Sequence, residues 1–259
     1  MPFVSPEIFV KQRLLSLQEY SLLTWRAIVG LFSRPIYWAD IYTQMDSIGV
    51  GSLPIVILTG FFTGCVLALQ SATALEAFGA KSKTGALVSL SMVKELGPVL
   101  TGLMVSGRNA AGMASELGSM KVTEQLDAMR ALGTDPIRKL VTPRLIATVF
   151  MLFFLTIIAD AFGIAGGALV SIFLLGLNAS SYLHNSYSGL IHGDIVQGLT
   201  KPLFSGFIIA TVGCYFGMKT TGGTQGVGRA TTQAVVASSV FIIIVDFLVS
   251  RLMIGIFGS

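Results

Sequence analysis

Residues 48–70 read IGVGSLPIVILTGFFTGCVLALQ and contain no charged side chain. A helix needs about 20 mostly apolar residues to cross a bilayer, so this stretch is long enough to span a membrane. The rest of the chain has the same character, because 53% of its 259 residues are hydrophobic and 12% are charged. A typical soluble domain carries about 25% charged residues. We therefore expect an all-α integral membrane protein.

Four further stretches are apolar enough to form spans. Together with 48–70 they predict five transmembrane helices, the others covering residues 86–107, 144–175, 199–217 and 233–257. No Pro-rich, Ser-rich or charged linker divides the chain. We expect residues 1–259 to form a single membrane domain.

The segment before the first span, residues 1–35, has a mixed pattern. Its apolar residues alternate with charged ones such as Lys11, Arg13 and Arg26, and Pro35 follows. This pattern is typical of an amphipathic helix that lies in the membrane interface with its basic side chains near lipid headgroups. We expect such an interfacial helix to end near Pro35.

The distribution of lysine and arginine predicts the orientation. The N-terminal segment holds four of these residues, the stretch 108–144 holds six, and 176–198 holds none. Because basic loops stay on the cytoplasmic side, we expect a cytoplasmic N-terminus, a periplasmic C-terminus and a bacterial inner-membrane location. Lys81 and Lys83 fall on the outer side and are the exception.

Other residue types exclude some functions. The net charge of +4 is spread over several loops, so nucleic-acid binding is not expected. Cys65 and Cys214 lie in apolar stretches, and His184 and His192 lie in a polar one. Their spacing matches no metal site. No constellation of nucleophile, acid and base indicates an enzyme.

Residues 113–132 are too charged to span a membrane but have a helical period. Val122, Leu126 and Met129 share one face, and Asp127 can pair with Arg130 at i,i+3. A passive surface helix and a helix that docks into a groove on a partner are both compatible with this pattern.

The glycine-rich stretch 223–231, GTQGVGRAT, has the glycine spacing of a phosphate-binding loop. Arg229 stands in place of the lysine of that motif and Ala230 in place of the residue that holds magnesium. We expect a tight cytoplasmic turn and no nucleotide site. If ATP drives this protein, the hydrolysing subunit is a separate polypeptide.

Lys94, Glu95, Asp160 and Asp246 are ionisable residues well inside the predicted spans. Lys94 and Glu95 either compensate each other or line a route for a substrate, with Lys94 able to approach a phosphate. Asp160 and Asp246 are expected to be buried and satisfied by neighbours, the alternative being a proton relay.

Two glycine pairs occur at a spacing of four. Gly60 and Gly64 lie in the first span, and Gly163 and Gly167 lie in the third. Small residues at this spacing allow close helix packing, either within one chain or across a dimer.

Three separated motifs resemble those of the MlaE/YrbE-type permeases. They are residues 116–129 (ELGSMKVTEQLDAM), residues 94–99 (KELGPV) followed by 106–109 (SGRN), and residues 226–232 (GVGRATT). The resemblance covers about residues 45–257. Members of this family are the membrane subunits of ATP-binding-cassette (ABC) lipid transporters associated with MCE proteins.

The resemblance implies two sets of functional residues. The loop 113–132 corresponds to the coupling helix that docks on the ATPase, with contact residues Glu116, Lys121, Glu124, Gln125, Asp127, Met129 and Arg130. The wall of a lipid cavity corresponds to Leu67, Gln70, Leu75, Phe78, Lys94 and Glu95.

The resemblance also implies partners and a function. We expect a homodimer with two ATPase subunits below it and a periplasmic MCE-protein ring above it, moving phospholipid and maintaining outer-membrane lipid asymmetry. The chain itself is expected to bind no cofactor, since ATP and Mg belong to the ATPase. Two alternatives remain open: an ion-coupled secondary transporter that uses Asp160, Glu95 or Asp246, and a membrane scaffold that transports nothing.

Overall fold

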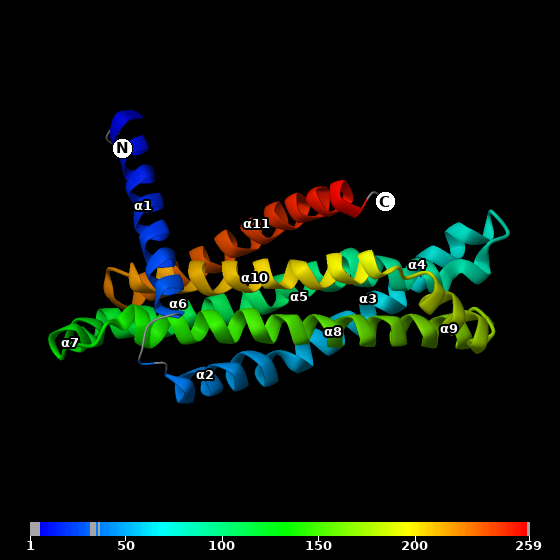
Figure 1. Cartoon of the computed structure of the whole chain (residues 1–259), viewed down its shortest axis with the longest axis horizontal. Helices are drawn as coiled ribbons and strands as arrows, with labels where there is room; N and C mark the ends of the chain where they lie inside the picture. Colours follow the sequence, from blue (N-terminus) through cyan, green and yellow to red (C-terminus); the bar gives the residue numbers. More distant parts are fainter. Residues whose placement is uncertain (1–5, 32–34, 36, 258–259) are drawn as a thin grey trace.

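The computed structural model describes residues 6–31, 35 and 37–257, and every regular element in these ranges is a helix (Figure 1). Residues 46–50, 92–96, 106–110 and 137–141 form π-helical turns, and residues 81–83 form a 3₁₀ turn. In chain order the elements are α1 (Pro6–Leu31), α2 (Trp38–Met45), η1 (Asp46–Val50), α3 (Gly51–Glu76), η2 (Lys81–Lys83), α4 (Thr84–Ser91), η3 (Met92–Leu96), α5 (Gly97–Val105), η4 (Ser106–Ala110), α6 (Ala111–Val122), α7 (Gln125–Ala131), η5 (Ile137–Val141), α8 (Thr142–Phe173), α9 (Ala179–Ser188), α10 (His192–Met218) and α11 (Gly223–Phe257).

Within the described ranges, five helical segments are long and apolar enough to cross a membrane. They cover residues 38–76, 81–122, 137–173, 192–218 and 223–255. This confirms the prediction of an all-α protein with five spans. Each segment begins before its predicted start, because backbone hydrogen bonding continues the helix through polar residues that hydropathy assigns to loops.

Close packing of α3 against α8 depends on the two glycine pairs. A side chain at Gly60 would bring its Cβ within 2.7 Å of the carbonyl oxygen of Ala159, and one at Gly64 would overlap the carbonyl oxygen of Gly163. The two predicted glycine motifs therefore meet each other inside one chain, as small residues do where membrane helices approach closely.

Helix α1 crosses the bundle steeply near the end where α10 meets α11 (Figure 1). Leu23 and Ala27 are buried against this end of the bundle, and the hydroxyl of Tyr20 lies 2.8 Å from that of Thr211. The outward side carries exposed apolar residues such as Trp25. The predicted interfacial helix is thus a helix over Pro6–Leu31, and residues 1–5 and 32–34 of that prediction lie outside the described residues.

The segment 113–132 differs from its prediction as one helix. Residues 81–122 form a continuous helical segment that includes α6. The helix is interrupted at Glu124, before α7 begins. Glu124 has φ 60°, a left-handed conformation that ends the α-helical hydrogen-bonding pattern. Of the three apolar residues predicted to share one face, Leu126 is buried while Val122 is exposed.

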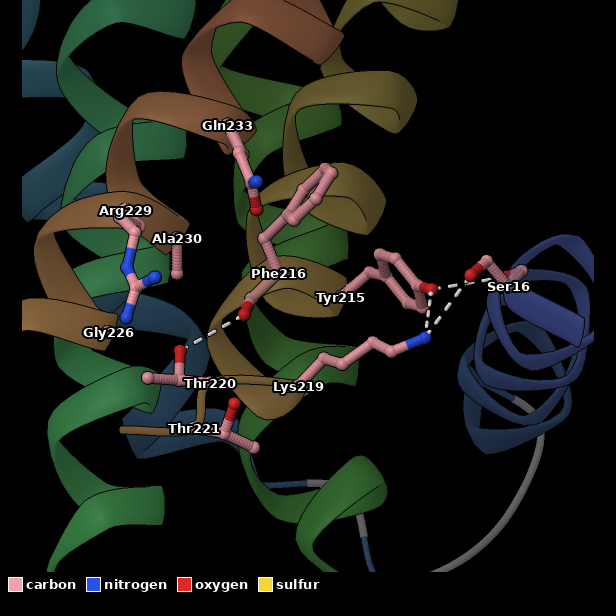
Figure 2. Close-up of a pocket in the computed structure, with 10 residues that line it drawn as sticks. All are labelled: Ser16, Tyr215, Phe216, Lys219, Thr220, Thr221, Gly226, Arg229, Ala230 and Gln233. Carbon is pink, nitrogen blue, oxygen red and sulfur yellow. Dashed lines mark hydrogen bonds between the residues drawn. The ribbon is translucent and has the colours of Figure 1, made fainter. Parts of the chain in front are cut away.

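The prediction of a tight turn over residues 223–231 is wrong, because these residues form the first turns of α11. The turn lies just before them, where Thr220 and Thr221 are labelled in Figure 2. Gly222 and Gly223 have φ values of 87° and 66°, which favour glycine. A side chain at Gly226 would overlap the carbonyl oxygen of Thr221. The glycines are therefore needed for the conformation of the turn, at Gly222 and Gly223, and for its close packing against Gly226.

Candidate functional site

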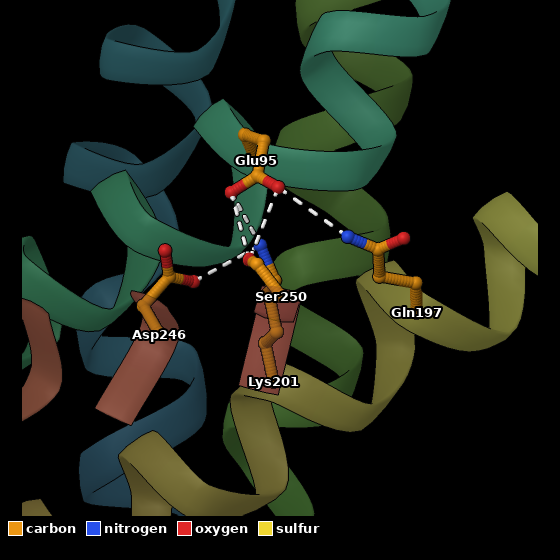
Figure 3. A network of polar contacts seen from close by, with 5 residues as sticks. All are labelled: Glu95, Gln197, Lys201, Asp246 and Ser250. Atoms are coloured by element: carbon orange, nitrogen blue, oxygen red, sulfur yellow. Dashed lines mark hydrogen bonds and ion pairs between the residues drawn. The ribbon is translucent and has the colours of Figure 1, made fainter. Parts of the chain in front are cut away.

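A cluster of charged and polar side chains joins three helices around Glu95 (Figure 3). The carboxylate of Glu95 forms an ion pair with Lys201 and accepts hydrogen bonds from Gln197 at 3.4 Å and from Ser250 at 3.2 Å. The ammonium of Lys201 also lies 3.2 Å from Asp246. One lysine thus holds two carboxylates within the membrane-spanning region.

The local backbone brings these side chains together. Glu95 belongs to the π-helical turn η3, a kind of insertion that often marks functional sites. Gly198 allows α10 to approach η3, since a side chain there would overlap the carbonyl oxygen of Val93. Gln197 and Lys201 are four residues apart on α10 and therefore face the same side.

Lys94 has a separate partner. Its ammonium lies 2.9 Å from Asp194, whose side chain also accepts a hydrogen bond from the backbone N–H of Ile191 at 3.0 Å. The interpretation of Lys94 and Glu95 as a pair that compensate each other is therefore wrong. Neighbouring residues on a helix point about 100° apart, so each reaches a different residue of α10.

Burial in the cluster is uneven. The Lys201 side chain is 1% exposed and that of Asp246 is 16% exposed, whereas that of Glu95 is 45% exposed. A buried ammonium must be paired to persist, which accounts for the two carboxylates. Because the Glu95 carboxylate is partly exposed, it can accept a hydrogen bond from a molecule outside the chain.

The four other residues predicted for the cavity wall lie at the end of α3 or just beyond it. Leu67 is half-buried and packs against the same small cluster as Leu96. Leu75 is half-buried, Gln70 is exposed, and Phe78 is 84% exposed past the end of the helix. Their role in lining a lipid cavity stays a prediction.

Helix α7 is held by one buried residue and one ion-paired carboxylate. Leu126 is 1% exposed, and Asp127 lies 2.8 Å from Lys121 and 2.9 Å from Arg130. This confirms the predicted i,i+3 pair. The hydrogen bond from Lys121 keeps the pKa of Asp127 below its usual value.

The remaining predicted coupling residues have different surroundings. Glu124 and Gln125 are exposed and Met129 is half-buried. Glu116 already has a partner within the chain. It forms an ion pair of 2.7 Å with Arg144, whose side chain is 3% exposed. Arg144 also donates to the carbonyl of Leu140 at 2.8 Å. Glu116 therefore ties α6 to the start of α8.

The sequence does not predict two of these ion pairs, Lys201–Glu95 and Arg144–Glu116. Lys201 falls near the start of the span predicted over 199–217, and Arg144 is the first residue of the span predicted over 144–175. A signal was present for the first, because Asp194, Gln197 and Lys201 follow a helical period once the helix is extended upstream. No comparable local pattern identifies Arg144.

The two acidic residues expected to be satisfied by neighbours have different outcomes. Asp246 is paired with Lys201 as expected. Asp160 is buried, but its Oδ1 has no hydrogen-bond partner in the described part of the chain, so the expectation is wrong for that atom. Asp160 faces Gly97, where any side chain would overlap Oδ1.

Comparison with known proteins identifies the family of this chain. The family model described as "Permease MlaE" matches residues 41–252. A probable ABC transporter permease protein of Rickettsia bellii is 44% identical over 237 residues, which cover 92% of each chain. The intermembrane phospholipid transport system permease protein MlaE of Haemophilus influenzae is 36% identical over 243 residues, covering 93% of this chain and 92% of that protein.

A plant protein is similar as well. The chloroplastic protein TRIGALACTOSYLDIACYLGLYCEROL 1 of Arabidopsis thaliana is 36% identical over 229 residues, covering 88% of this chain and 65% of that protein. The family match covers three of the spans found in the described residues completely, and most of the first and last spans. This multi-pass membrane chain therefore belongs to the MlaE family of ABC transporter permeases.

Proposed function

We propose that this chain is the permease subunit of an ABC transporter that moves phospholipids between the bacterial inner membrane and a periplasmic MCE-domain carrier. It works as a homodimer with a separate cytoplasmic ATPase, and its transport maintains the lipid asymmetry of the outer membrane. The name of the Haemophilus influenzae relative, a phospholipid transport permease, supports the substrate class.

The observation that carries the proposal is the partly open charge cluster inside the spans. A lipid needs apolar walls for its acyl chains and a polar group for its headgroup. Ionisable residues in membrane helices usually mark a substrate route. Glu95 offers its exposed carboxylate to a headgroup donor, while Lys94 is held by Asp194 and meets a phosphate only if that pair opens.

A mechanical link connects the cluster to the cytoplasmic end. Residues 81–122 form one helical segment from η2 to the end of α6, and η3 with Glu95 lies within it. Helix α7 follows after the break at Glu124 and presents exposed Gln125 to a partner. A push by the ATPase on α7 is transmitted along this segment to η3, where a π-helical turn can change its geometry.

Co-purification tests the partners. The tagged protein, extracted in detergent, is expected to bring down an ATPase. Glu124→Lys and Asp127→Lys are expected to abolish ATP-driven lipid movement while the protein stays in the membrane. Normal transport with intact ATPase binding in both variants would refute the coupling role of α7.

Mass spectrometry of bound lipid tests the substrate. Purified protein is expected to carry phospholipid, and Glu95→Gln is expected to alter the amount or headgroup composition. Lys83→Gln is the matched control, because Lys83 is exposed and lies outside the cluster. A preparation that contains neither lipid nor ATPase would contradict the proposal.

The buried Asp160 favours a second candidate, an ion-coupled transporter. Its Oδ1 has no hydrogen-bond partner among the described residues, and unpaired membrane acids occur in proton relays. Transport by the isolated chain that follows a proton gradient and stops in Asp160→Asn would favour this candidate. ATP-dependent transport that survives Asp160→Asn would exclude it.

A further inference from the structure

A polar pocket lies at the end of the bundle opposite α9, between α1, the end of α10 and the start of α11 (Figures 1 and 2). It has a volume of about 420 Å³, within the range of pockets that hold small ligands. Most of the side chains that line it can donate hydrogen bonds, among them Ser16, Tyr215, Lys219, Thr221, Arg229 and Gln233.

One side of the pocket holds a fixed cation. Lys219 lies 2.5 Å from Glu19, 3.1 Å from the hydroxyl of Tyr215 and 3.3 Å from the hydroxyl of Ser16. The hydrogen bond to Glu19 raises the pKa of Lys219 above its usual value, so the ammonium stays charged. Glu19 neutralises this charge and binds α1 to the end of α10.

The other side holds a cation without such a partner. Arg229 is exposed on the first turns of α11, and it makes no hydrogen bond or ion pair with the described part of the chain. Its guanidinium stands beside the turn, since a side chain at Gly222 would reach within 3.4 Å of it. Because Glu19 offsets only Lys219, the pocket carries one uncompensated positive charge.

The free donors suit one kind of ligand. The guanidinium of Arg229 presents a planar fork of N–H groups that matches the oxygens of a phosphate. Thr221 and Gln233 add a hydroxyl and an amide, both exposed. An anion with several oxygens can therefore bridge α11 and the turn that follows α10.

The position of the pocket indicates where that anion comes from. Helix α10 ends at Met218 and α11 starts at Gly223, so the turn lies at the boundary of the membrane. Helix α1 forms one wall, and its exposed Leu17 and Trp25 are typical of a helix at the level of lipid headgroups. Basic pockets between membrane helices on the cytoplasmic side bind anionic headgroups.

We propose that this pocket binds a phosphate group, supplied by an anionic phospholipid of the cytoplasmic leaflet, through Arg229 and its neighbours. The choice of leaflet rests on the orientation in the proposed function. The pocket is distinct from the Glu95 cluster, because Arg229 precedes Asp246 on α11 by a helical rise of about 25 Å. A lipid bound there links α1 and α10 to α11 and makes their packing depend on membrane composition.

The test uses the purified complex in nanodiscs of phosphatidylcholine, with or without a minor fraction of phosphatidylglycerol. Native mass spectrometry counts the lipids that each variant retains. The wild type is expected to retain phosphatidylglycerol over phosphatidylcholine by about tenfold, the effect of one charge-assisted hydrogen-bonded contact. Arg229→Gln is expected to lose this preference, and Arg229→Lys to keep part of it.

Arg26→Gln is the matched control, because Arg26 is an exposed arginine of α1 that does not line the pocket. It is expected to keep the preference. If Arg229→Gln does not fold, Thr221→Val provides the comparison, with a smaller loss. Inorganic phosphate, added to discs of phosphatidylcholine alone, separates the two sources. A rise in melting temperature that depends on Arg229 would support the phosphate site but assign it to soluble phosphate.

Retention of phosphatidylglycerol by Arg229→Gln at the wild-type level would overturn the proposal. If the same variant also loses the ATPase, the pocket is a contact surface for that protein. Failure of the proposed function gives a different result. The wild-type protein would then bring down no ATPase, or its bound lipid would not change in Glu95→Gln. Neither result depends on what replacing Arg229 does.

Discussion

The charged cluster around Lys201 and the one around Asp127 use the same kinds of side chains in different surroundings. Lys201 is 1% exposed and contacts residues of η3 and α11 that lie far away in the sequence. Asp127 is 48% exposed, and its partners Lys121 and Arg130 are six and three residues away. The first cluster joins separate helices, whereas the second shapes a local surface.

This difference predicts how each region responds to change. In a buried cluster, removal of one partner leaves a charge that water cannot reach, which is strongly destabilising. In an exposed cluster, water and salt replace a lost partner at little cost. The first region is therefore suited to holding the spans in register, and the second to forming and releasing contacts with a partner.

The largest effect is expected for Lys201→Met. This change leaves Glu95 and Asp246 close together without a cation, and removal of one partner from a buried pair costs about 3–5 kcal/mol. We expect a clear drop in melting temperature in detergent and loss of transport. Lys83→Met is the control, because Lys83 is exposed and its replacement is expected to change the melting temperature little.

A rescue experiment separates charge from packing. The triple variant Lys201→Met, Glu95→Gln and Asp246→Asn removes all three charges, so most of the stability is expected to return. Transport is expected to stay impaired if Glu95 contacts the lipid. A triple variant as unstable as Lys201→Met alone would show that the lysine acts through its packing.

The pair Glu116–Arg144 is intermediate, because one partner is exposed and the other is buried. Glu116→Gln leaves the Arg144 side chain, 3% exposed, with an uncompensated charge, which costs about 1–3 kcal/mol. Arg144→Met leaves Glu116, 57% exposed, which water can solvate. We expect Glu116→Gln to lower the melting temperature more than Arg144→Met does. The reverse order would contradict this assignment of burial.

The spans could be predicted from the sequence because each contains enough consecutive apolar residues for a bilayer, as in residues 48–70. The partners of the ionisable residues could not. Glu95 and Lys201 are 106 residues apart, and only the close approach of α10 at Gly198 brings them together. Hydropathy detects lipid-facing length, and it carries no information on which helices pack against each other.

The coupling region shows the same limit on a smaller scale. The pair Asp127–Arg130 could be predicted because i,i+3 residues are neighbours on any helix. The break at Glu124 could not, since neither glycine nor proline marks it and a glutamate rarely adopts φ 60°. Local spacing thus predicts contacts within an element, but not the points where tertiary packing ends the element.

A smaller effect is expected for Glu124→Gly. The left-handed conformation costs a non-glycine residue about 1–2 kcal/mol, and the greater entropy of an unfolded glycine offsets part of the gain. We expect the free energy of local unfolding of α7 to rise by about 0.5–1 kcal/mol. Hydrogen exchange in α7 is then slower, and the melting temperature of the protein does not change. Glu124→Ala keeps the strain and is the control. If the glycine variant exchanges faster than Glu124→Ala, the strain does not lie at this residue.

The smallest effect is expected for the ion pairs of Asp127, and it depends on pH with a definite sign. Because Lys121 holds the pKa of Asp127 below its ordinary value of 3.8, the pair stabilises α7 fully above that pH and loses its effect as the pH falls through the lowered pKa. Hydrogen exchange in α7 is expected to quicken only below about pH 4, and Asp127→Asn is expected to remove this step. High salt is expected to weaken the effect, since the carboxylate is exposed. A change in the melting temperature of the whole protein as large as that of Lys201→Met would mean that α7 is part of the buried framework, and the contrast between the two charged regions would not hold.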